Sequence, residues 1–406
     1  MSSFTRRALL SKLAVAAAPA VEDAGRHTLI VVFLRGGADT MNLVVPYADD
    51  SYYKARPTIA VKAPTSDADK SRAIRLDDRY AFHPALQPLH EKFSEGRLAI
   101  VQAVGTDNTT GSHFECQDQM EHGDSMAASA AGGGWLGRYL RTRANTKLGP
   151  LSAVALGTAL PESLRGAPVA SVMQSLEEIA IRTPSGKPDA AAAVLAAMYG
   201  ADVTLLGAQG RETLDLFKRV SALQQSTYKP ANDAKYPKDS FGNGMREIAR
   251  LIKARVGLEV ACIDVGGWDT HFFQGTTDSF QAERARILAE GLAAFDADLK
   301  DQRGNFTVMV TTEFGRRIYE NASLGTDHGR GFALMTLSNR IQGGRILGKW
   351  PCVVENDSPA GPGDMQIQHD YRSVFAEVLR GSLGLDAKAA RAEFPKCDFG
   401  KVGLVA

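Results

Sequence analysis

The stretch TLIVVFLRGGAD at residues 28–39 decides the fold. Its first seven residues are an unbroken run of β-branched and apolar side chains. Such a run is typical of a central strand of a parallel sheet, which is buried on both faces. The Gly36-Gly37 turn then brings Asp39 to the carboxyl end of that strand. Because open α/β sheets bind their ligands at this edge, Asp39 is a candidate ligand.

Three more apolar runs predict further strands, and each ends in a polar loop. They are LAIVQAVG at 98–105, GLEVACI at 257–263 and FTVMVT at 306–311. A predicted helix at 279–299 separates the last two. Strands alternating with helices predict right-handed crossovers and a doubly wound, mostly parallel α/β sheet. Strand signals weaken from about 157 to 255, which predicts a helical insertion over the sheet, with helices near 190–198 and 211–225.

Composition limits the classes of partner. Lys plus Arg total 47 and Asp plus Glu total 46, so the chain lacks the basic excess of a nucleic-acid-binding protein. No uninterrupted apolar stretch approaches the roughly 20 residues of a membrane helix. We therefore expect one α/β domain at residues 21–406, with no membrane span and no nucleic-acid partner.

The N-terminus resembles an export signal. Arg6-Arg7 precede apolar residues, and the small residues Ala18-Pro19-Ala20 follow. This pattern predicts a twin-arginine signal at 1–20, a periplasmic or secreted protein, and the export machinery as a partner. The alternative is a disordered basic tail. The cysteines form no CxxC pair; Cys352 and Cys397 could bridge in an oxidising compartment, but the sequence does not choose among the pairings.

The polar loops contain residues suited to metal binding. Asp269 and His271 are two residues apart, so both face one side of an extended backbone. His328 follows Asp327 in a glycine-flanked loop, and Glu313 would complete the set. Carboxylate and imidazole ligands suit a divalent metal, and we expect one or two ions of zinc or manganese. The alternatives are a hydrogen-bonded pair at 269–271 and a structural turn at 325–331.

Two arginines lie near these candidate ligands. Arg316 and Arg330 could hold an anionic ester group through paired N–H donors. The alternative is that they form ordinary surface ion pairs. If the arginines bind an anion, the expected substrate is a small anionic ester or a sulfated or phosphorylated molecule.

A hydroxyl cluster follows the strand at 98–105. Thr109, Thr110 and Ser112 are candidate nucleophiles, which a metal would activate. Ser112 with Glu115 three residues later also has the form of a capping box, and the two roles are compatible. His113 could bind metal, contact a leaving group or simply pack.

Many motifs, in order, resemble those of a bacterial family. The resemblance covers nearly all of the chain after the signal and is to the domain-of-unknown-function family numbered 1501. This family is grouped with the alkaline phosphatase and sulfatase superfamily, which implies a doubly wound α/β fold but no established reaction. The motifs are VVFLRGGAD (31–39), FHPAL (82–86), SHF (112–114), GWLGR (134–138), TEFGR (312–316), DHGRG (327–331) and DYR (370–372).

The wider superfamily implies roles for single residues. Members similar to cofactor-independent phosphoglycerate mutase and phosphopentomutase place a metal-binding Asp after the first strand, which Asp39 matches. The loop 107–113 looks like the phosphopentomutase nucleophile loop, with Ser112 inserted between Gly and His. Either Asp327-His328 is the superfamily's Asp-His pair, or Glu313 takes the place of that Asp. The second placement fits the strand context, and Phe314 then replaces a histidine ligand, which counts against a full two-metal centre.

Two functions follow as hypotheses. The first is an exported metal-dependent hydrolase or transferase that acts on a phosphate or sulfate ester through a Ser or Thr nucleophile. The second is a degenerate superfamily member that binds an anionic ligand or a partner in the periplasm without turnover. No Cys-x-Pro-x-Arg signature occurs, which counts against a formylglycine sulfatase. For the first hypothesis, Asp269, His271, Glu313 and His328 should converge, with Ser112 or a neighbouring threonine facing them.

Overall fold

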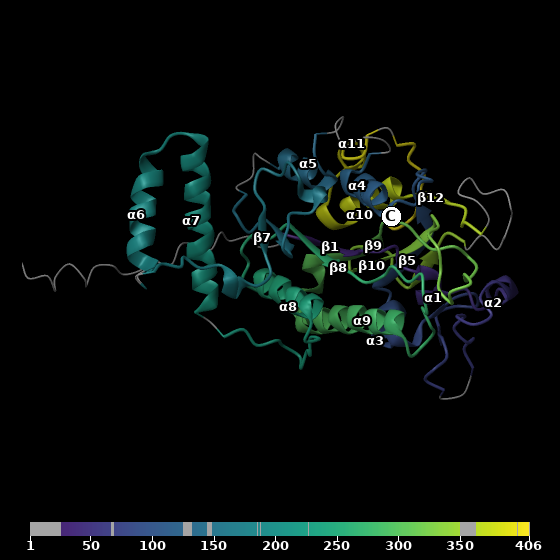
Figure 1. Ribbon diagram of the computed structural model, residues 1–406. Coiled ribbons are helices and arrows are strands. Elements are labelled where there is room, and N and C mark those ends of the chain that lie inside the picture. The colour runs from purple at the N-terminus through teal and green to yellow at the C-terminus, as the bar shows by residue number, and fades with distance from the viewer. Residues whose placement is uncertain are drawn as a thin grey trace, which may run out of the picture.

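A nine-stranded, mostly parallel sheet forms the centre of the molecule (Figure 1). The computed structural model describes residues 26–65, 69–124, 132–143, 148–184, 186, 188–225, 227–349, 363–395 and 397–405. The sheet order is β11-β5-β10-β9-β1-β8-β6-β7, with β12 beside β5, and β10 runs antiparallel to both of its neighbours. The strands are β1 Thr28–Leu34, β5 Leu98–Gly105, β6 Ala153–Leu156, β7 Ser171–Met173, β8 Val260–Val265, β9 Phe306–Thr312, β10 Phe332–Ser338, β11 Arg345–Leu347 and β12 His369–Asp370.

Strand β1 lies in the middle of this sheet, parallel to β8 on one side and to β9 on the other. All seven of its residues are buried. Ile30 and Val32 belong to the core on one face, whereas Leu29 and Val31 belong to the core on the other. Burial on both faces explains the continuous apolar run, because alternate side chains of a strand point to opposite sides. The predicted doubly wound α/β sheet is confirmed.

Helices cover both faces of the sheet. Figure 1 shows α3, α8 and α9 on one face and α4, α5 and α10 on the other. A small second sheet contains β2 Val44–Val45, β3 Ile74–Arg75 and β4 Ala81–Phe82. The helices are α1 Thr40–Leu43, α2 Asp50–Ala55, α3 Gln87–Ser94, α4 His113–His122, α5 Trp135–Thr142, α6 Pro188–Ala201, α7 Leu205–Gln224, α8 Ser240–Lys253, α9 Phe280–Asp298, α10 Tyr371–Leu383 and α11 Ala387–Ala392.

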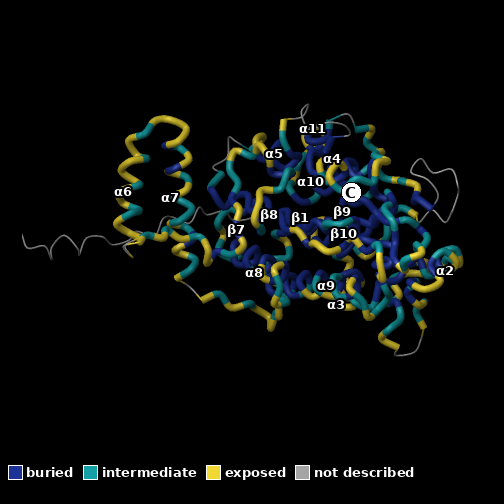
Figure 2. The backbone as a smooth tube through the Cα atoms, in the orientation of Figure 1, coloured by how far each residue is buried: buried dark blue, intermediate teal, exposed yellow. Residues whose placement is uncertain are grey.

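The segment 157–255 is helical, but most of it does not lie over the sheet. Helix α8 packs on the sheet as expected, and β7 adds a strand at the sheet edge that the sequence did not indicate. Helices α6 and α7 instead form a hairpin that projects to one side (Figure 1), and Figure 2 shows it largely exposed. The rich alanine content gives α6 no single apolar stripe, so its sequence does not indicate which face is covered.

Some predictions fall on residues outside the described ranges. These are the export signal at 1–20 and the possible bridge involving Cys352. Cys116 and Cys262 are buried free thiols. In the described part of the chain, no helix is long and apolar enough to cross a membrane.

Candidate metal centre

The loops that follow β5 and β8 and the loop that joins β9 to β10 meet at one edge of the sheet. Asp269 and His271 follow β8, and Glu313 follows β9. His113 begins α4, shortly after β5. His328 precedes β10, which enters the sheet from this same edge because it runs antiparallel. The predicted meeting of these loops is therefore present.

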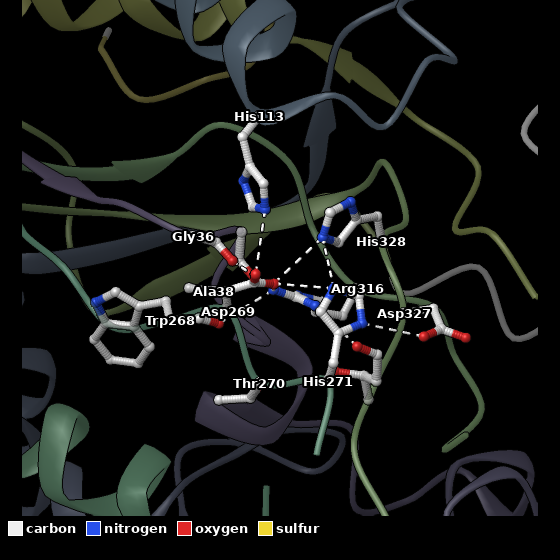
Figure 3. A network of polar contacts seen from close by, with 12 residues as sticks. Gly36, Ala38, His113, Trp268, Asp269, Thr270, His271, Arg316, Asp327 and His328 are labelled. Carbon is white, nitrogen blue, oxygen red and sulfur yellow. Dashed lines mark hydrogen bonds and ion pairs between the residues drawn. The ribbon is translucent and has the colours of Figure 1, made fainter. Parts of the chain in front are cut away.

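Three histidines and one aspartate point toward a common volume (Figure 3). The donor atoms of His113, Asp269 and His328 all lie within 4.8 Å of one another. The Nε2 atoms of His113 and His328 lie 3.5 and 3.3 Å from the Asp269 carboxylate oxygens. His271 Nε2 lies 3.1 Å from Asp269 Oδ1 and 2.9 Å from His328 Nε2. His271 thus joins the set through two of its three other members.

The other ring nitrogen of each histidine faces a group that only accepts hydrogen bonds. Each Nδ1 therefore carries the hydrogen, and in a neutral ring Nε2 is left with a lone pair. Three lone pairs and a carboxylate consequently face the same space. The Nδ1 contacts are His113 to Glu313 Oε1 at 2.9 Å, His271 to Asp327 Oδ1 at 3.2 Å and His328 to the Gly111 carbonyl at 2.7 Å.

This donor set fits a divalent metal. Two imidazole lone pairs 2.9 Å apart repel each other unless a proton or a cation lies between them. Zinc binds His and carboxylate donors at roughly 2.0–2.2 Å, so two ligands of one tetrahedral ion lie about 3.3 Å apart. The separations of Asp269 from each histidine and of His271 from His328 are 2.9 to 3.5 Å, which bracket that value. Carboxylates and carbonyls at Nδ1 are also the groups that orient metal-binding histidines.

Glu313 lies behind His113 and not among the donors, which corrects the expectation that it is a ligand. Its Oε1 accepts hydrogen bonds from the Gly36 N–H at 2.8 Å and the Gln117 amide at 3.0 Å, as well as from His113. Burial opposes ionisation, but these hydrogen bonds outweigh it and bring the pKa of Glu313 to about 2. The hydrogen bond between His113 and Glu313 also raises the pKa of His113. His113 is therefore the residue that faces the metal site, and Glu313 orients its ring.

Asp327 also lies one step behind the donors, although the sequence suggested a ligand. Its Oδ1 accepts from His271 and from the Asn321 amide at 3.0 Å. The hydrogen bond from Asn321 is the main cause of the lowered pKa of Asp327. Asn321 also donates to the His271 carbonyl at 3.0 Å, so it fixes both residues.

Asp39 does not reach the donors, and its expected role as a ligand is not supported. It is almost fully buried in an ion pair with Arg56, with 2.6 Å between Arg56 Nη1 and Asp39 Oδ2. Gln274 donates to the same oxygen at 2.6 Å. Both carboxylate oxygens therefore accept from protein groups, because Arg56 Nη2 bonds Oδ1 at 3.1 Å.

Arg316 is buried and used within the protein, which corrects the expectation of an anion-binding role. It donates to the carbonyls of Gly36, Gly37 and Thr326 and to Asp269 Oδ1 at 2.5 Å. Burial would raise the pKa of Asp269, but the hydrogen bond and charge of Arg316 outweigh it and lower that pKa. Arg316 thus positions a donor and ties three loops together.

Arg330, the second predicted anion-binding residue, also turns inward. Its Nη2 donates to the Thr106 carbonyl at 2.8 Å, and its Nη1 lies 3.8 Å from Asp364. Its side chain is mostly buried. Neither arginine is therefore presented to an incoming anion.

The hydroxyl loop lies beside the donors and makes local contacts. Ser112 caps α4, with its Oγ accepting from the Glu115 N–H at 3.5 Å, so the predicted N-cap is confirmed. Thr110 Oγ1 accepts from the Ser112 N–H at 3.2 Å, and Thr109 is exposed. The Gly111 carbonyl in this loop holds His328. That one of these hydroxyls faces a metal stays a prediction.

A family model described as a protein of unknown function, DUF1501, matches residues 26–390. The chain belongs to the DUF1501 family. The loops that carry all four donors lie inside the matched range. No curated protein matches this chain significantly.

Three solved structures are similar to this chain at low sequence identity. The C-terminal periplasmic domain of EcEptC from Escherichia coli, in complex with zinc, has 9% identity and a TM-score of 0.34, over 77% of this chain and 73% of that chain. Alkaline phosphatase from the Antarctic bacterium TAB5 has 10% identity and a TM-score of 0.29, over 77% and 92%. The PsFucS1 sulfatase from Pseudoalteromonas sp. has 11% identity and a TM-score of 0.31, over 94% and 74%. At this similarity the comparison assigns no residue of the site.

Several residues that shape this DUF1501 site were not singled out from the sequence. Gln117 lies four residues after His113 on α4, and that one-turn spacing is a usable signal. Arg56, Gln274 and Asn321 reach their partners through tertiary structure, so local sequence gives no sign of their roles. Gly36 is required by close approach, because a Cβ there would lie 2.6 Å from the Asp269 backbone nitrogen.

Proposed function

We propose that this DUF1501 protein is a metal-dependent hydrolase that acts on a phosphate or sulfate ester. The observation that carries the proposal is the convergence of three imidazole Nε2 atoms on the Asp269 carboxylate. A divalent ion bound there would supply Lewis-acid polarisation of the ester and stabilise developing negative charge. The Asp269 side chain is 46% exposed, so a substrate can approach the donors from solvent.

The protein residues hold these donors in place before any ligand arrives. Arg316 fixes Asp269, and the carboxylates of Glu313 and Asp327 fix the rings of His113 and His271. Such pre-organisation reduces the reorganisation needed during a reaction. In this proposal a hydroxyl of Thr109, Thr110 or Ser112 is the nucleophile, and the helix N-terminus behind Ser112 favours an anionic group. The ion is zinc or manganese.

The test is metal content together with turnover of 4-nitrophenyl phosphate and 4-nitrophenyl sulfate. We expect near-stoichiometric metal in the full chain, lost together with turnover in His328→Ala. His90→Ala is the matched control, because His90 lies on α3 and bonds only the Arg75 carbonyl among its described contacts. Metal that persists in His328→Ala would contradict the proposal.

A second group of possible donors needs its own control. Asp118, His122 and Glu162 also lie close enough to hold an ion. His122→Ala should leave metal content unchanged if the ion is bound by His328 and its neighbours. Loss of metal in His122→Ala alone would move the site to that second group.

The alternative is a protein that binds an anionic ligand without turnover. One observation counts against turnover: Arg316 and Arg330 are both committed to protein acceptors, so neither can stabilise the charge that develops on a reacting ester group. Stoichiometric metal without hydrolysis of either ester would select this alternative.

We also propose export by the twin-arginine route to the periplasm, supported by Arg6-Arg7 and Ala18-Pro19-Ala20. Replacing both arginines by lysine should retain the protein in the cytoplasm.

A further inference from the structure

Large apolar side chains are exposed beside the metal donors. Among the described residues, most of the strongly exposed large apolar side chains lie either on the α6–α7 hairpin or next to a donor. Monomeric proteins rarely leave such side chains clustered in water, and clusters of this kind mark binding sites. Those next to the donors, which we call the apolar rim, are Phe114 at 87%, Phe272 at 70%, Phe273 at 76% and Leu324 at 41% exposure.

The residues of the apolar rim lie next to a metal donor in the chain or in the loop that carries one. Phe114 directly follows His113 in the first turn of α4. Phe272 directly follows His271, with 6.4 Å between the two ring centroids. Leu324 lies in the loop that leads to His328. All three loops that carry the donors therefore present an apolar side chain to solvent.

Backbone hydrogen bonds hold two members of the apolar rim side by side. The Phe273 N–H donates to the Ser323 carbonyl at 2.9 Å, and the Gln274 N–H donates to the Leu324 carbonyl at 2.9 Å. Phe273 and Leu324 have φ angles of 43° and 59°, in the left-handed region that disfavours residues with a Cβ. Strained backbone of this kind persists where the surrounding structure imposes it and is common at ligand sites. The exposure of these side chains is therefore built into the loops.

The chemistry of the apolar rim limits what it can recognise. Phenylalanine and leucine side chains have no hydrogen-bond donors or acceptors, so they cannot pair with the hydroxyls of a sugar. They offer apolar area and aromatic faces. At this site the metal donors and the hydroxyl loop at 109–112 supply the polar groups, because Arg316 is buried and Arg330 donates to the Thr106 carbonyl.

We propose that the apolar rim binds the apolar alcohol part of the ester, so that the substrate class is an aryl or alkyl monoester and not a sugar ester. This inference rests on the proposed function and names its substrate class. The metal centre holds the charged phosphate or sulfate, and the rim covers the group beyond the scissile bond. Hydrolysis adds water across the ester, releasing an apolar alcohol and inorganic phosphate or sulfate.

The test compares 2-(1-naphthyl)ethyl phosphate and sulfate with glucose 6-phosphate and glucose 6-sulfate, using the metal-loaded full chain. All four are esters of primary alcohols, so their leaving groups are matched. We expect kcat/KM to be about tenfold or more higher for the naphthyl esters, as for other apolar contacts beside a reacting group. Phe272→Ser and Phe114→Ser, on separate elements, should each remove much of this preference, measured as the ratio of kcat/KM for the naphthyl ester to kcat/KM for the glucose ester. Met198→Ser is the matched control, because Met198 is a large apolar residue on α6 that is also exposed, at 61%.

Each outcome decides between the proposals. Equal rates for naphthyl and glucose esters, or a preference unchanged in both phenylalanine variants, would overturn the rim proposal while ester turnover still supports the hydrolase. If no ester is hydrolysed, the proposed function fails. Fluorescence titration with 1-naphthyl phosphate then tests whether the apolar rim binds an apolar group. Binding about tenfold weaker in Phe272→Ser than in Met198→Ser would support the rim, and equal binding would overturn it. Phe272→Leu, which keeps apolar area, should restore most of the binding.

Discussion

The Arg316 side chain makes a set of hydrogen bonds that a lysine at this position could not make. Its guanidinium donates to four carbonyls, those of Gly36, Gly37, Trp268 and Thr326, and to Asp269 at the same time, and its side chain is fully buried. A lysine presents a single compact ammonium group, which cannot span these acceptors. The position of Asp269 therefore depends on the planar shape of the arginine as well as on its charge.

We expect Arg316→Lys to lower the free energy of unfolding by about 3 kcal/mol, because several buried acceptors lose their donors. It should also weaken metal binding, since Asp269 loses its anchor. Chemical denaturation and metal titration measure the two effects. Arg286→Lys, on an exposed ion pair with Glu283, is the control and should change neither quantity. Unchanged metal affinity in Arg316→Lys would contradict the positioning role.

His83 gives a prediction for pH, away from the donors. It is buried, its Nδ1 accepts from the Ala85 N–H at 3.0 Å, and burial lowers its pKa from 6.5 to about 4. The unfolded chain therefore binds this proton at a higher pH than the folded chain does. The stabilisation is complete above about pH 6.5 and is lost as pH falls to about 4, by about 3 kcal/mol.

His83→Asn keeps an N-cap side chain and removes the titration. We expect its unfolding free energy to depend less on pH between 6.5 and 4 than that of the unmodified chain. The comparison is made by urea denaturation with a chelator present, so that metal release does not contribute. If the unfolding free energies of the two proteins depend on pH in the same way, burial of His83 does not lower its pKa and the prediction is wrong.

At the scale of elements, helix α4 begins with both a cap and a donor. Ser112 is its N-cap and His113 is its first residue. The helix start therefore sets the direction of the His113 ring, and Glu313 and Gln117 complete its surroundings. Cap and metal donor are adjacent, so effects on stability and on turnover must be separated by the choice of substitution.

Ser112→Ala should lower the free energy of unfolding by about 1 kcal/mol through loss of the cap. Ser112→Asn should preserve stability, because asparagine caps as well as serine. If Ser112 is the nucleophile, both variants lose ester turnover; if Thr109 or Thr110 is, Ser112→Asn stays active. Thermal denaturation and turnover measured on the same samples separate these cases.

At the scale of the whole molecule, ligand binding and folding are linked. The donors come from loops on both sides of β1, so they converge only when the sheet has formed. Metal that binds the folded state alone stabilises it, by about 2.7 kcal/mol at a free concentration of 100 times Kd. We expect zinc or manganese to raise the Tm, a chelator to reverse the rise, and His328→Ala to show no rise. Equal shifts in the variant would place the binding elsewhere.

The sequence predicted the fold better than the details of the site. Strands β1 and β5 were predicted at their observed residues, because continuous apolar runs report burial on both faces. The loops that meet at the sheet edge follow from those strands. Which side chain faces the metal site does not follow from the sequence. Glu313 was therefore placed among the expected ligands, and His113 was left open between metal binding, leaving-group contact and packing. Asp39 was misjudged because Arg56 reaches it only after the chain has folded.

The antiparallel strand β10 has a consequence for the order in which the protein is made. Synthesis produces His113 first, then Asp269 and His271, and His328 only just before β10 itself. His328 is held at the sheet edge because β10 inserts between β5 and β9, two strands made earlier. A nascent chain that ends between residues 328 and 338 therefore carries all four donors but lacks the complete strand that holds His328 in place. Metal retained by this protein would then report that the last central strand has been inserted.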